Sequence, residues 1–589
     1  MVRRVEWAAA QSRLPERDTR GDGRPGPSRR VTLLVGVVAL VIGIYAFGST
    51  LAGIILNYSP VPFYDEWDGY INKYMEFQHH PWMALWSPHN EHRQVLARLV
   101  FLPDIKWFGG LDLLSLAVDF LLCVLTVLLL LRILRRASER NRATDLFLTG
   151  LVVACGFSWI QWENFTTGFQ IPFFAVCLFG LLSFHALTIC QQRDGSVAWF
   201  GVSIVAGIAA ALSMANGLLI LPLVCLLAVL LRLSWTKVVV TAVVAALMWA
   251  AYLYHPAGEI GALAQDSPAA TLLHHPLLCL AFVLLYLGSP ARYLLGGVHP
   301  LEWQLEFALG LLTLFGIVAG FLLMLRRRER AVAPEFWMMA VAAGTSSVIT
   351  ASGRLSFTLL AALISRYTTQ AFMAWIGLLL FFILNLRRDQ RRPLFALSGL
   401  VLIGVAIAQG HSLNPNRLFA FERKLGGLAL RNDVYDEAYT KPIYPYHDHL
   451  VVVAKHAQAE GLSIFGRDVP GYADPPAHPV AAGACEGHVD SVQPTGTPGK
   501  FVIEGWAFDR AHRDPPDTIV VVGPDGRSVG VGIFGKSRRD IREKLGIKQK
   551  RTGWVAFANT SPGGYQVLGR TDTGAYCTIG GVVGLSPAK

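Results

Sequence analysis

The chain has 589 residues, of which 53% are hydrophobic and only 16% are charged, and its mean hydropathy is +0.42. These values exclude an ordinary soluble protein of this size and are typical of a polytopic membrane protein. The net charge is +11. Because the Lys and Arg residues cluster between apolar segments, as in loops that stay in the cytoplasm, we expect no nucleic-acid partner.

The first segment, 1–30, is basic, contains Pro and Gly and has no apolar run. This indicates a disordered cytoplasmic tail and not a cleavable signal peptide. Eleven apolar segments follow, each about long enough to cross a bilayer, although several are short. The sequence therefore predicts an α-helical polytopic membrane protein whose transmembrane domain covers 31–410. The segments are 31–57, 110–132, 145–160, 171–189, 197–213, 217–232, 237–254, 303–325, 335–352, 368–386 and 393–410.

Arginine clusters indicate the orientation of these spans. They follow the second, eighth and tenth spans, at 132–142, 326–330 and 387–392. All three fall on the same side as the basic N-terminus, which the positive-inside rule makes cytoplasmic. Eleven crossings then leave everything after about 411 outside. The polar, aromatic and acidic loops share that outer side, so an active site would face outward.

One shorter apolar piece, Pro276 to Leu287, interrupts this count. It is too short for an ordinary transmembrane helix. A crossing there would also place the arginines at 326–330 on the outer side. We therefore expect a re-entrant or interfacial helix within a long outer loop.

The composition changes after the last span. Residues 411–483 read as an outer linker with one helix, from His449 to Gly461, and 484–589 as a small all-β domain of sandwich or barrel type. Cys485 and Cys577 bracket the β domain on the oxidising side of the membrane, which predicts a disulfide. The expected strands are Lys500 to Phe508, Thr518 to Val522, Arg527 to Ile533, Gly553 to Ala558 and Gly564 to Arg570, with a turn at Asp525-Gly526.

The first outer loop begins with the acidic and aromatic run Phe63-Tyr64-Asp65-Glu66-Trp67-Asp68. It could be a solvated turn in which Asp68 caps the next helix. The alternative is a catalytic loop, with Asp65 and Glu66 as the catalytic candidates and Asp68 as a substrate contact. Aromatic neighbours can stack on a sugar, and a carboxylate half-buried against them has its pKa raised toward the range of a general base.

The run His89-Asn90-Glu91-His92-Arg93 follows some twenty residues later. It is either a polar loop without a role or a contact for phosphate or sugar, formed by His89, Glu91, His92 and Arg93, with Arg93 as the anion partner. A divalent metal held by His89 and His92 with Asp65 or Glu66 is a further alternative, although no spacing enforces it.

Three further outer segments carry candidate substrate contacts. Glu163 and Asn164 lie in a polar and aromatic loop that could equally be an interfacial aromatic belt. Arg354, Arg366 and Tyr367 lie on the outer side against the positive-inside trend. These arginines either pair with lipid headgroups or clamp the phosphate of a lipid-linked donor.

Asp119, within the second span, has a functional or a structural role.

A long first outer loop with an acidic pair directly after the first span, many spans and an outer C-terminal domain resemble the superfamily-C (GT-C) glycosyltransferases. This superfamily includes the protein O-mannosyltransferases and the lipid A aminoarabinose transferases. The resemblance covers 31–410 by topology, and its local motif is Tyr64-Asp65-Glu66. The segment Gly505-Trp506-Ala507-Phe508-Asp509 looks like the appended β domain of bacterial membrane transferases.

The resemblance implies that Asp65 is the catalytic base and that the donor is a polyprenyl-phosphate sugar. Such a site lies at the outer face of the bacterial inner membrane, where the sugar passes with inversion to an acceptor of the cell envelope. Two other function classes stay open. A transporter or flippase of a lipid-linked saccharide would need ionisable groups in mid-membrane, where Asp119 is the candidate. A non-catalytic assembly protein would not need the acidic first loop.

Overall fold

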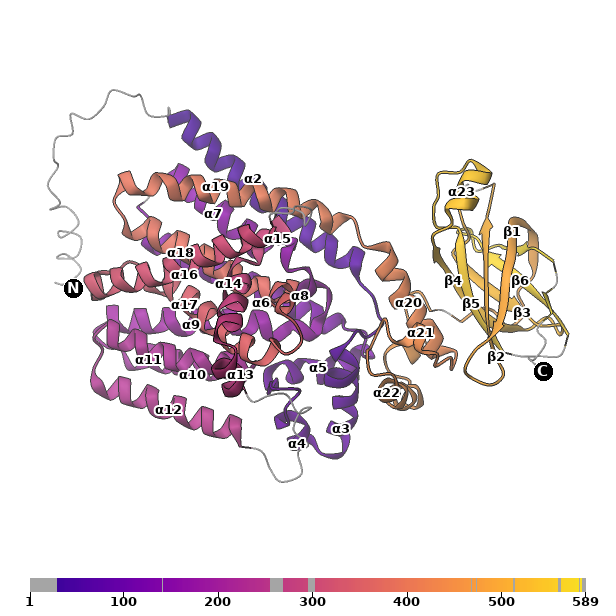
Figure 1. Cartoon of the computed structure of the whole chain (residues 1–589), viewed down its shortest axis with the longest axis horizontal. Coiled ribbons are helices and arrows are strands. Elements are labelled where there is room, and N and C mark those ends of the chain that lie inside the picture. The colour runs from indigo at the N-terminus through magenta and orange to yellow at the C-terminus, as the bar shows by residue number, and fades with distance from the viewer. Residues whose placement is uncertain are drawn as a thin grey trace.

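The computed structural model describes residues 29–584 except 140, 255–267, 295–301, 468, 473, 512–513, 560–562 and 582. All but the last two residues of the expected tail, 1–30, lie outside these residues. Three parts follow one another along the longest axis of the molecule (Figure 1): a helical body, a helical linker and a β-barrel.

Each of the eleven apolar segments forms a helix in the body. Among the described residues, nine helical stretches are long and apolar enough to cross a membrane, which confirms the expected fold class. The number differs from eleven because α10 and the stretch 215–230 are shorter and α17 is not among the nine, while 276–294 is added. The eleven helices are α2 (Arg29–Asn57), α6 (Leu113–Ala137), α7 (Arg142–Gly156), α9 (Ile171–Gln192), α10 (Val197–Ala211), α11 (Ile220–Leu230), α12 (Trp235–Leu253), α16 (Glu302–Arg327), α17 (Pro334–Arg354), α18 (Thr368–Asn385) and α19 (Arg392–Ala408).

The short apolar piece forms α14 (Pro276–Gly288) and continues into α15 (Pro290–Leu294), after the short α13 (Pro268–His274). Phe282 and Leu285 are fully buried, and α14 packs against α16 and α17. The helix therefore packs against the helical body, and its position relative to the membrane stays a prediction.

Length and composition alone would allow 276–294 to cross. However, the guanidinium of Arg232 lies 3.8 Å from the carboxylate of Glu329. This pair brings the start of α12 and the end of α16 to the same face. If α12 and α16 both cross the membrane, an additional crossing by 276–294 would not fit this pair, and the re-entrant helix stays our prediction.

The basic connectors that the sequence assigns to the cytoplasm also meet in space. The carboxylate of Glu139, after α6, lies 3.0 Å from the guanidinium of Arg388 and 3.3 Å from that of Arg391, both after α18. These connectors therefore share one end of the body. The orientation of that end in the membrane stays a prediction.

Two polar side chains fix the C-terminal end of α2, after which the first outer loop begins. The Thr50 hydroxyl donates to the Phe157 carbonyl at 2.6 Å, and the Gln409 amide donates to the Thr50 hydroxyl at 2.6 Å. The C-terminal ends of α2, α7 and α19 are thus tied together within the body. The loop that starts after Asn57 therefore leaves from a defined place.

The linker consists of α20 (Arg417–Arg431), α21 (Glu437–Thr440) and α22 (His447–Ala459). Only α22 was expected, where the sequence predicted 449–461. Leu425 and Leu428 of α20 belong to the same buried hydrophobic cluster as Trp67 and Ile71 of the first outer loop. The linker and the first outer loop therefore share one hydrophobic core, which fixes the position of the acidic run.

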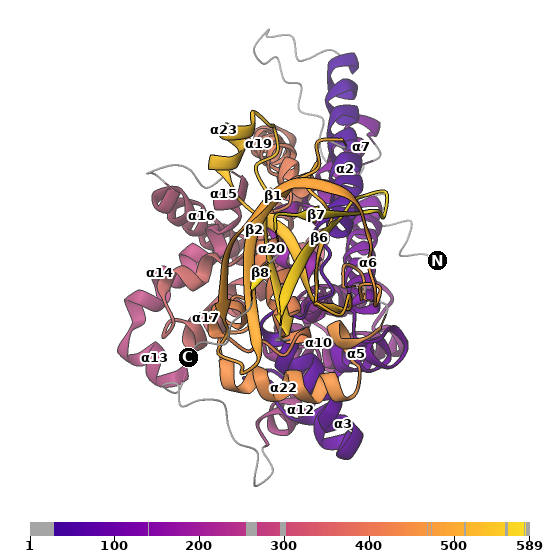
Figure 2. The ribbon, with the colours of Figure 1, turned by 90° about the vertical axis from the view of Figure 1, so that its right-hand side faces the viewer.

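The C-terminal domain is a closed barrel, which lies in front of the rest of the molecule in Figure 2. Its strands are β1 (Ala481–Pro494), β2 (Lys500–Phe508), β3 (Thr518–Val522), β4 (Ser528–Lys536), β5 (Gly553–Asn559), β6 (Gly564–Arg570), β7 (Tyr576–Ile579) and β8 (Val583–Gly584), with a short helix, α23 (Arg539–Leu545), between β4 and β5. The order is β3-β4-β5-β2-β1-β7-β6-β8, and the β3–β6 pairing closes the ring. β1 and β7 run parallel, and the other neighbours are antiparallel.

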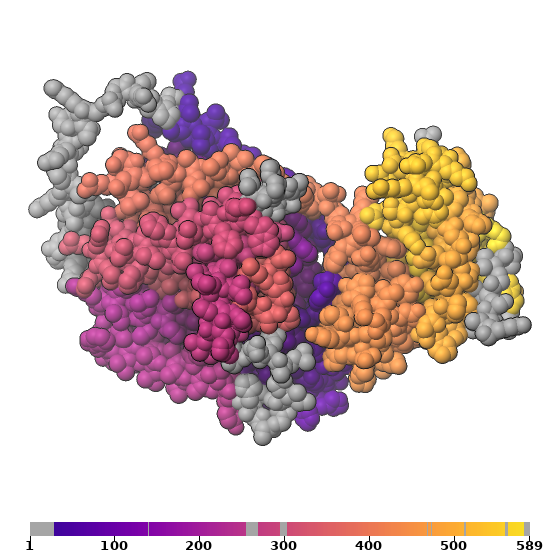
Figure 3. Space-filling view, viewed as in Figure 1, coloured from indigo at the N-terminus to yellow at the C-terminus, as the bar shows by residue number. Residues whose placement is uncertain are grey.

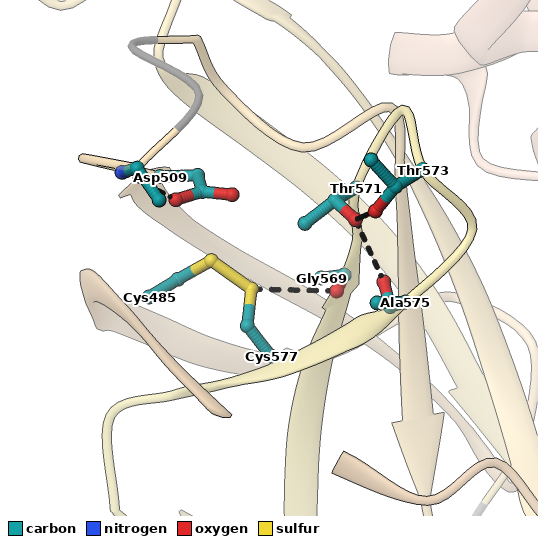
Figure 4. Close-up of a disulfide and its surroundings, with 8 residues drawn as sticks. Cys485, Asp509, Gly569, Thr571, Thr573, Ala575 and Cys577 are labelled. Atoms are coloured by element: carbon teal, nitrogen blue, oxygen red, sulfur yellow. Dashed lines mark hydrogen bonds between the residues drawn. A yellow bond between two sulfur atoms is a disulfide. The ribbon is translucent and has the colours of Figure 1, made fainter. Parts of the chain in front are cut away.

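The predicted disulfide is confirmed. Cys485 of β1 and Cys577 of β7 are bonded, with 5.3 Å between their Cα atoms (Figure 4). The bond therefore joins the parallel pair of strands. On the outside of the barrel, Val555 and Phe557 join the core of the linker, and the ring of Phe557 lies 5.0 Å from that of Tyr439.

Candidate active site

The acidic run folds into a tight turn followed by a π-helical turn. Tyr64 has a φ of +50°, which a non-glycine residue rarely adopts, and its N–H donates to the Ile443 carbonyl of the linker at 2.8 Å. The π-helical turn covers Trp67–Asn72. π-helical turns occur frequently at functional sites. A Cβ at Gly69 would lie 2.5 Å from the Phe169 ring, so glycine lets this turn approach the second outer loop, 161–170.

The structure separates the two catalytic candidates. Glu66 is 2% exposed, accepts from the Phe63 N–H at 2.6 Å and lies 3.3 Å from the guanidinium of Arg423. Asp112 lies behind it and accepts from the Gly168 N–H at 2.8 Å. Glu66 is therefore enclosed by protein, and the expectation that it is a catalytic group is corrected to a structural one.

Burial governs the titration of this enclosed group. Burial raises the pKa of Glu66, although the positive charge of Arg423 opposes the shift. Burial and the charge of Glu66 raise the pKa of Asp112 well above its usual value. A protonated Asp112 can donate to an ionised Glu66, which then neutralises Arg423. The cluster thereby joins the first loop to α20.

Asp65 and Asp68, by contrast, reach solvent and share one imidazole. The side chains are 41% and 37% exposed, whereas that of His89 is 6% exposed. His89 Nδ1 lies 3.5 Å from Asp68 Oδ2, and its Nε2 lies 3.9 Å from Asp65 Oδ1. The structure therefore brings together three of the predicted site residues.

Two residues that the sequence analysis did not single out complete this acidic cluster of Asp65, Asp68 and His89. His449 Nε2, on α22, lies 3.3 Å from Asp68 Oδ1, and the Asn72 amide lies 3.3 Å from the same oxygen. The expected role of Asp68 as a helix cap is not seen, because its carboxylate faces these groups. No local signal marks His449, since it comes from the linker.

The charged groups around the cluster shift its pKa values in the direction opposite to the shift that burial causes. Burial alone would raise the pKa of Asp65, as the sequence analysis expected, but His89 and the charges of Arg366 and Arg354 bring that pKa below its usual value. Burial likewise acts on Asp68, and His89 and His449 lower its pKa. Burial would lower the pKa of His89, but the two carboxylates raise it. The cluster therefore favours an imidazolium between two carboxylates.

The second polar run forms a tight hairpin turn. The backbones of His89 and His92 exchange hydrogen bonds at 2.8 and 2.9 Å, and Asn90 has a φ of +50°. Glu91 extends from the turn, and its carboxylate lies 2.5 Å from the guanidinium of Arg354 and 3.5 Å from His92 Nε2. Burial lowers the pKa of His92. This ion pair links the first outer loop to the end of α17.

Arg93 was the expected anion partner, and the structure corrects this. Its side chain is buried, and its guanidinium donates to the carbonyls of Trp86, Tyr252 and Tyr254 at 2.5, 2.8 and 2.6 Å. Backbone carbonyls from two distant segments thus surround the charge. Arg93 anchors the turn to the end of α12.

The second outer loop meets the start of α18. The Arg366 N–H donates to the Glu163 carboxylate at 3.3 Å, and the Asn164 amide donates to the Arg366 carbonyl at 2.9 Å. The guanidinium of Arg366 lies 5.7 Å from the ring centroid of Tyr367. The charge of the Arg366 guanidinium acts on Glu163 as well as on Asp65, and it lowers the pKa of Asp65.

The proposed metal ligands do not converge. Glu66 points into the protein, and His92 turns toward Glu91. Within the part of the chain that the structure describes, no group of three or more His, Cys, Asp or Glu side chains could hold a metal ion.

Comparisons with known proteins give little beyond this geometry. No protein-family model matches the chain, and no curated protein matches it. Among solved structures, the chain is similar to the archaeal oligosaccharyltransferase AglB from Archaeoglobus fulgidus in complex with an inhibitory peptide and a dolichol-phosphate. The identity is 16% and the TM-score is 0.34, and the match covers 70% of this chain and 60% of that chain. At these values the likeness carries no argument about function.

Proposed function

We propose that the chain is a membrane glycosyltransferase that moves a sugar from a polyprenyl-phosphate donor to a hydroxyl group of an extracytoplasmic acceptor, with inversion. One observation carries the proposal. Asp65 is a half-exposed carboxylate that His89 and two arginines hold in its ionised form. It follows directly after α2, where a lipid-linked donor and an external acceptor can both reach it.

In the proposed reaction, the acceptor oxygen attacks the anomeric carbon of the donor and transfers its proton to Asp65. The bond between that carbon and the phosphate oxygen breaks, and the phosphate leaves with the bonding electrons. Arg366 stabilises the charge on the leaving phosphate, with Arg354 as a second candidate. Attack on the face opposite the leaving group inverts the anomeric configuration.

His89 orients Asp65 and does not take up the proton that Asp65 accepts. His89 lies on the buried side of Asp65 and Asp68, and both carboxylates favour its charged form. The imidazolium fixes the orientation of Asp65. It also keeps Asp65 ionised, so that the carboxylate can accept a hydrogen bond from the acceptor hydroxyl. The low pKa of Asp65 makes it a weak base, so proton transfer follows bond breaking at the anomeric carbon.

The test uses membranes that contain the full chain and a polyprenyl-phosphate sugar with a labelled sugar. Asp65→Asn keeps the shape and removes the basicity, so transfer should fall by about 10²- to 10⁴-fold. Asp448→Asn makes the same change at an exposed position on α22 and should keep full activity. Full transfer by Asp65→Asn would remove the mechanism.

The same assay addresses the two other function classes. A flippase would move the lipid-linked saccharide across the membrane without cleaving its phosphate bond, and an assembly protein would leave it unchanged. Asp119, the mid-membrane candidate, is 1% exposed, and neither carboxylate oxygen accepts a hydrogen bond from a described residue.

A further inference from the structure

A separate cavity of about 630 Å³ lies where the outer ends of α2 and α19 meet the second outer loop and α20. Figure 3 shows the surface hollowed between the helical body and α20. Asp65, Asp68 and His89 do not line it, so it is distinct from the acidic cluster.

The polar part of the cavity wall is positively charged. Arg423 and Lys424, from neighbouring positions on α20, both line it, and none of the described lining residues is acidic. Arg423 is already engaged by Glu66 and by the Val61 carbonyl. Lys424 is half-buried, and its ammonium makes no hydrogen bond or ion pair with a described residue.

The surroundings of Lys424 favour a bound anion. Burial lowers the pKa of its ammonium, and the charge of Asp517 only partly offsets this. The start of α20 also faces the cavity, because Asn414 and Asn416 line it and the helix begins at Arg417. The first turn of a helix carries partial positive charge. That charge falls off within the first turn and Lys424 lies further along α20, so the ammonium is the main partner for a phosphate.

The rest of the wall is apolar and continues to the lipid-facing surface. Trp159, Trp162 and Tyr293 line it, and aromatic side chains of this kind are enriched at membrane interfaces. Leu56, at the end of α2, is 53% exposed and also lines it. Ile407, on α19 beside the lining residue Ala408, is 66% exposed. An apolar chain can thus leave the cavity sideways into the bilayer.

We propose that this cavity binds an anionic phospholipid, with the phosphate at Lys424 and an acyl chain that leaves over the exposed ends of α2 and α19. The positive charge fits the phosphate of a phospholipid, and the aromatic wall and the lateral exit fit its interfacial region and its acyl chain. This site does not depend on the transferase activity. It lies beside the proposed donor site, because Trp162 lines the cavity and the next residue, Glu163, contacts the backbone of Arg366.

Lipid binding by the purified full chain in detergent tests the proposal, with native mass spectrometry as the readout. Phosphatidylglycerol is the probe, diacylglycerol lacks the phosphate, and glycerol phosphate lacks the chains. Only phosphatidylglycerol should bind tightly. Lys424→Ala should weaken its binding about tenfold or more, because a charge-assisted contact is lost, and Lys424→Arg should restore part of it.

Lys441→Ala is the matched control, since Lys441 is exposed in the same linker and does not line the cavity. The Lys441→Ala variant should bind phosphatidylglycerol as tightly as the unaltered chain does. The measurement is repeated in an Arg366→Ala background, which removes the proposed donor clamp. Unchanged phosphatidylglycerol binding by Lys424→Ala in both backgrounds would overturn the proposal. Since no sugar is present, an inactive transferase would leave this result intact.

Discussion

His449 Nε2 lies 3.3 Å from Asp68 Oδ1, although 381 residues separate the two in sequence. His89 approaches the other oxygen of Asp68 at 3.5 Å. The carboxylate is thus held between the first outer loop and α22 of the linker. The linker therefore supplies a side chain to the acidic cluster, and it also connects the helical body to the barrel.

Replacing His449 tests whether this contact matters for turnover. His449→Ala should lower the transfer rate about fivefold to tenfold, because one charge-assisted contact that orients Asp68 is lost at a partly exposed position. His456→Ala changes an exposed histidine on the same helix and should be silent. Rates and donor affinity are measured for both variants. Equal rates for the two would show that His449 takes no part.

Glu66 separates a structural role from a catalytic one. Glu66→Gln leaves the buried Arg423 without a counter-charge, which should lower the free energy of unfolding by about 3–5 kcal/mol. Adding Arg423→Met should recover much of that loss, since no charge is then left unpaired. Thermal unfolding in detergent provides the measurement. A Glu66→Gln protein with unchanged stability and no turnover would return Glu66 to catalysis.

The regular elements could be predicted because their signals are local. Hydropathy located all eleven apolar helices, and runs of β-branched and aromatic residues predicted β2 and β3 with the bounds that are found. β1 was missed, since it is rich in Gly, Ala and polar residues. α20 was missed because charged residues and a Gly-Gly pair interrupt its apolar residues, so no continuous apolar run marks it.

The candidate site could be predicted only in part. Asp65 and Glu66 are neighbours, and nothing in the local sequence says which of them points into the protein. That is decided by Arg423, which lies 357 residues away from Glu66. Arg93 lies in a polar run that resembles an anion-binding site, but its guanidinium donates hydrogen bonds to the carbonyls of Tyr252 and Tyr254. Long-range packing therefore assigns these roles.

The acidic cluster should make stability depend on pH in a defined direction. The folded pKa of His89 is raised above 6.5, so its contribution is present below pH 6.5 and is lost as the pH rises through the folded value. The folded pKa of Asp65 is lowered from 3.8, so its contribution is lost only as the pH falls through that lower value. His89→Gln should therefore flatten the decline in melting temperature between pH 6 and pH 9. The same decline in the variant would contradict the coupling, and His456→Gln is the control.

Arg366 is the proposed clamp for the donor phosphate. Arg366→Ala should weaken donor binding by about 1.5–3 kcal/mol, because hydrogen bonds to charged groups are lost. Arg366→Lys should recover only part, since a point charge replaces a planar fork. Arg417→Ala, at an exposed position of the linker, is the control. Normal donor binding by both Arg366 variants would show that Arg366 does not bind the phosphate, and Arg354 would become the candidate.

The orientation of the chain in the membrane decides whether the acidic cluster can meet an external acceptor. Positive-inside loops predict that the connector with Arg388 is cytoplasmic and that the linker with Lys441 is outside. Both side chains are exposed, so Arg388→Cys and Lys441→Cys place one new thiol on each side. An impermeant maleimide added to intact cells should label position 441 and not position 388. Both should react after detergent solubilisation, which controls for accessibility. Labelling of 388 alone in intact cells would place Asp65 in the cytoplasm, and the proposed reaction would then have to use a cytoplasmic acceptor.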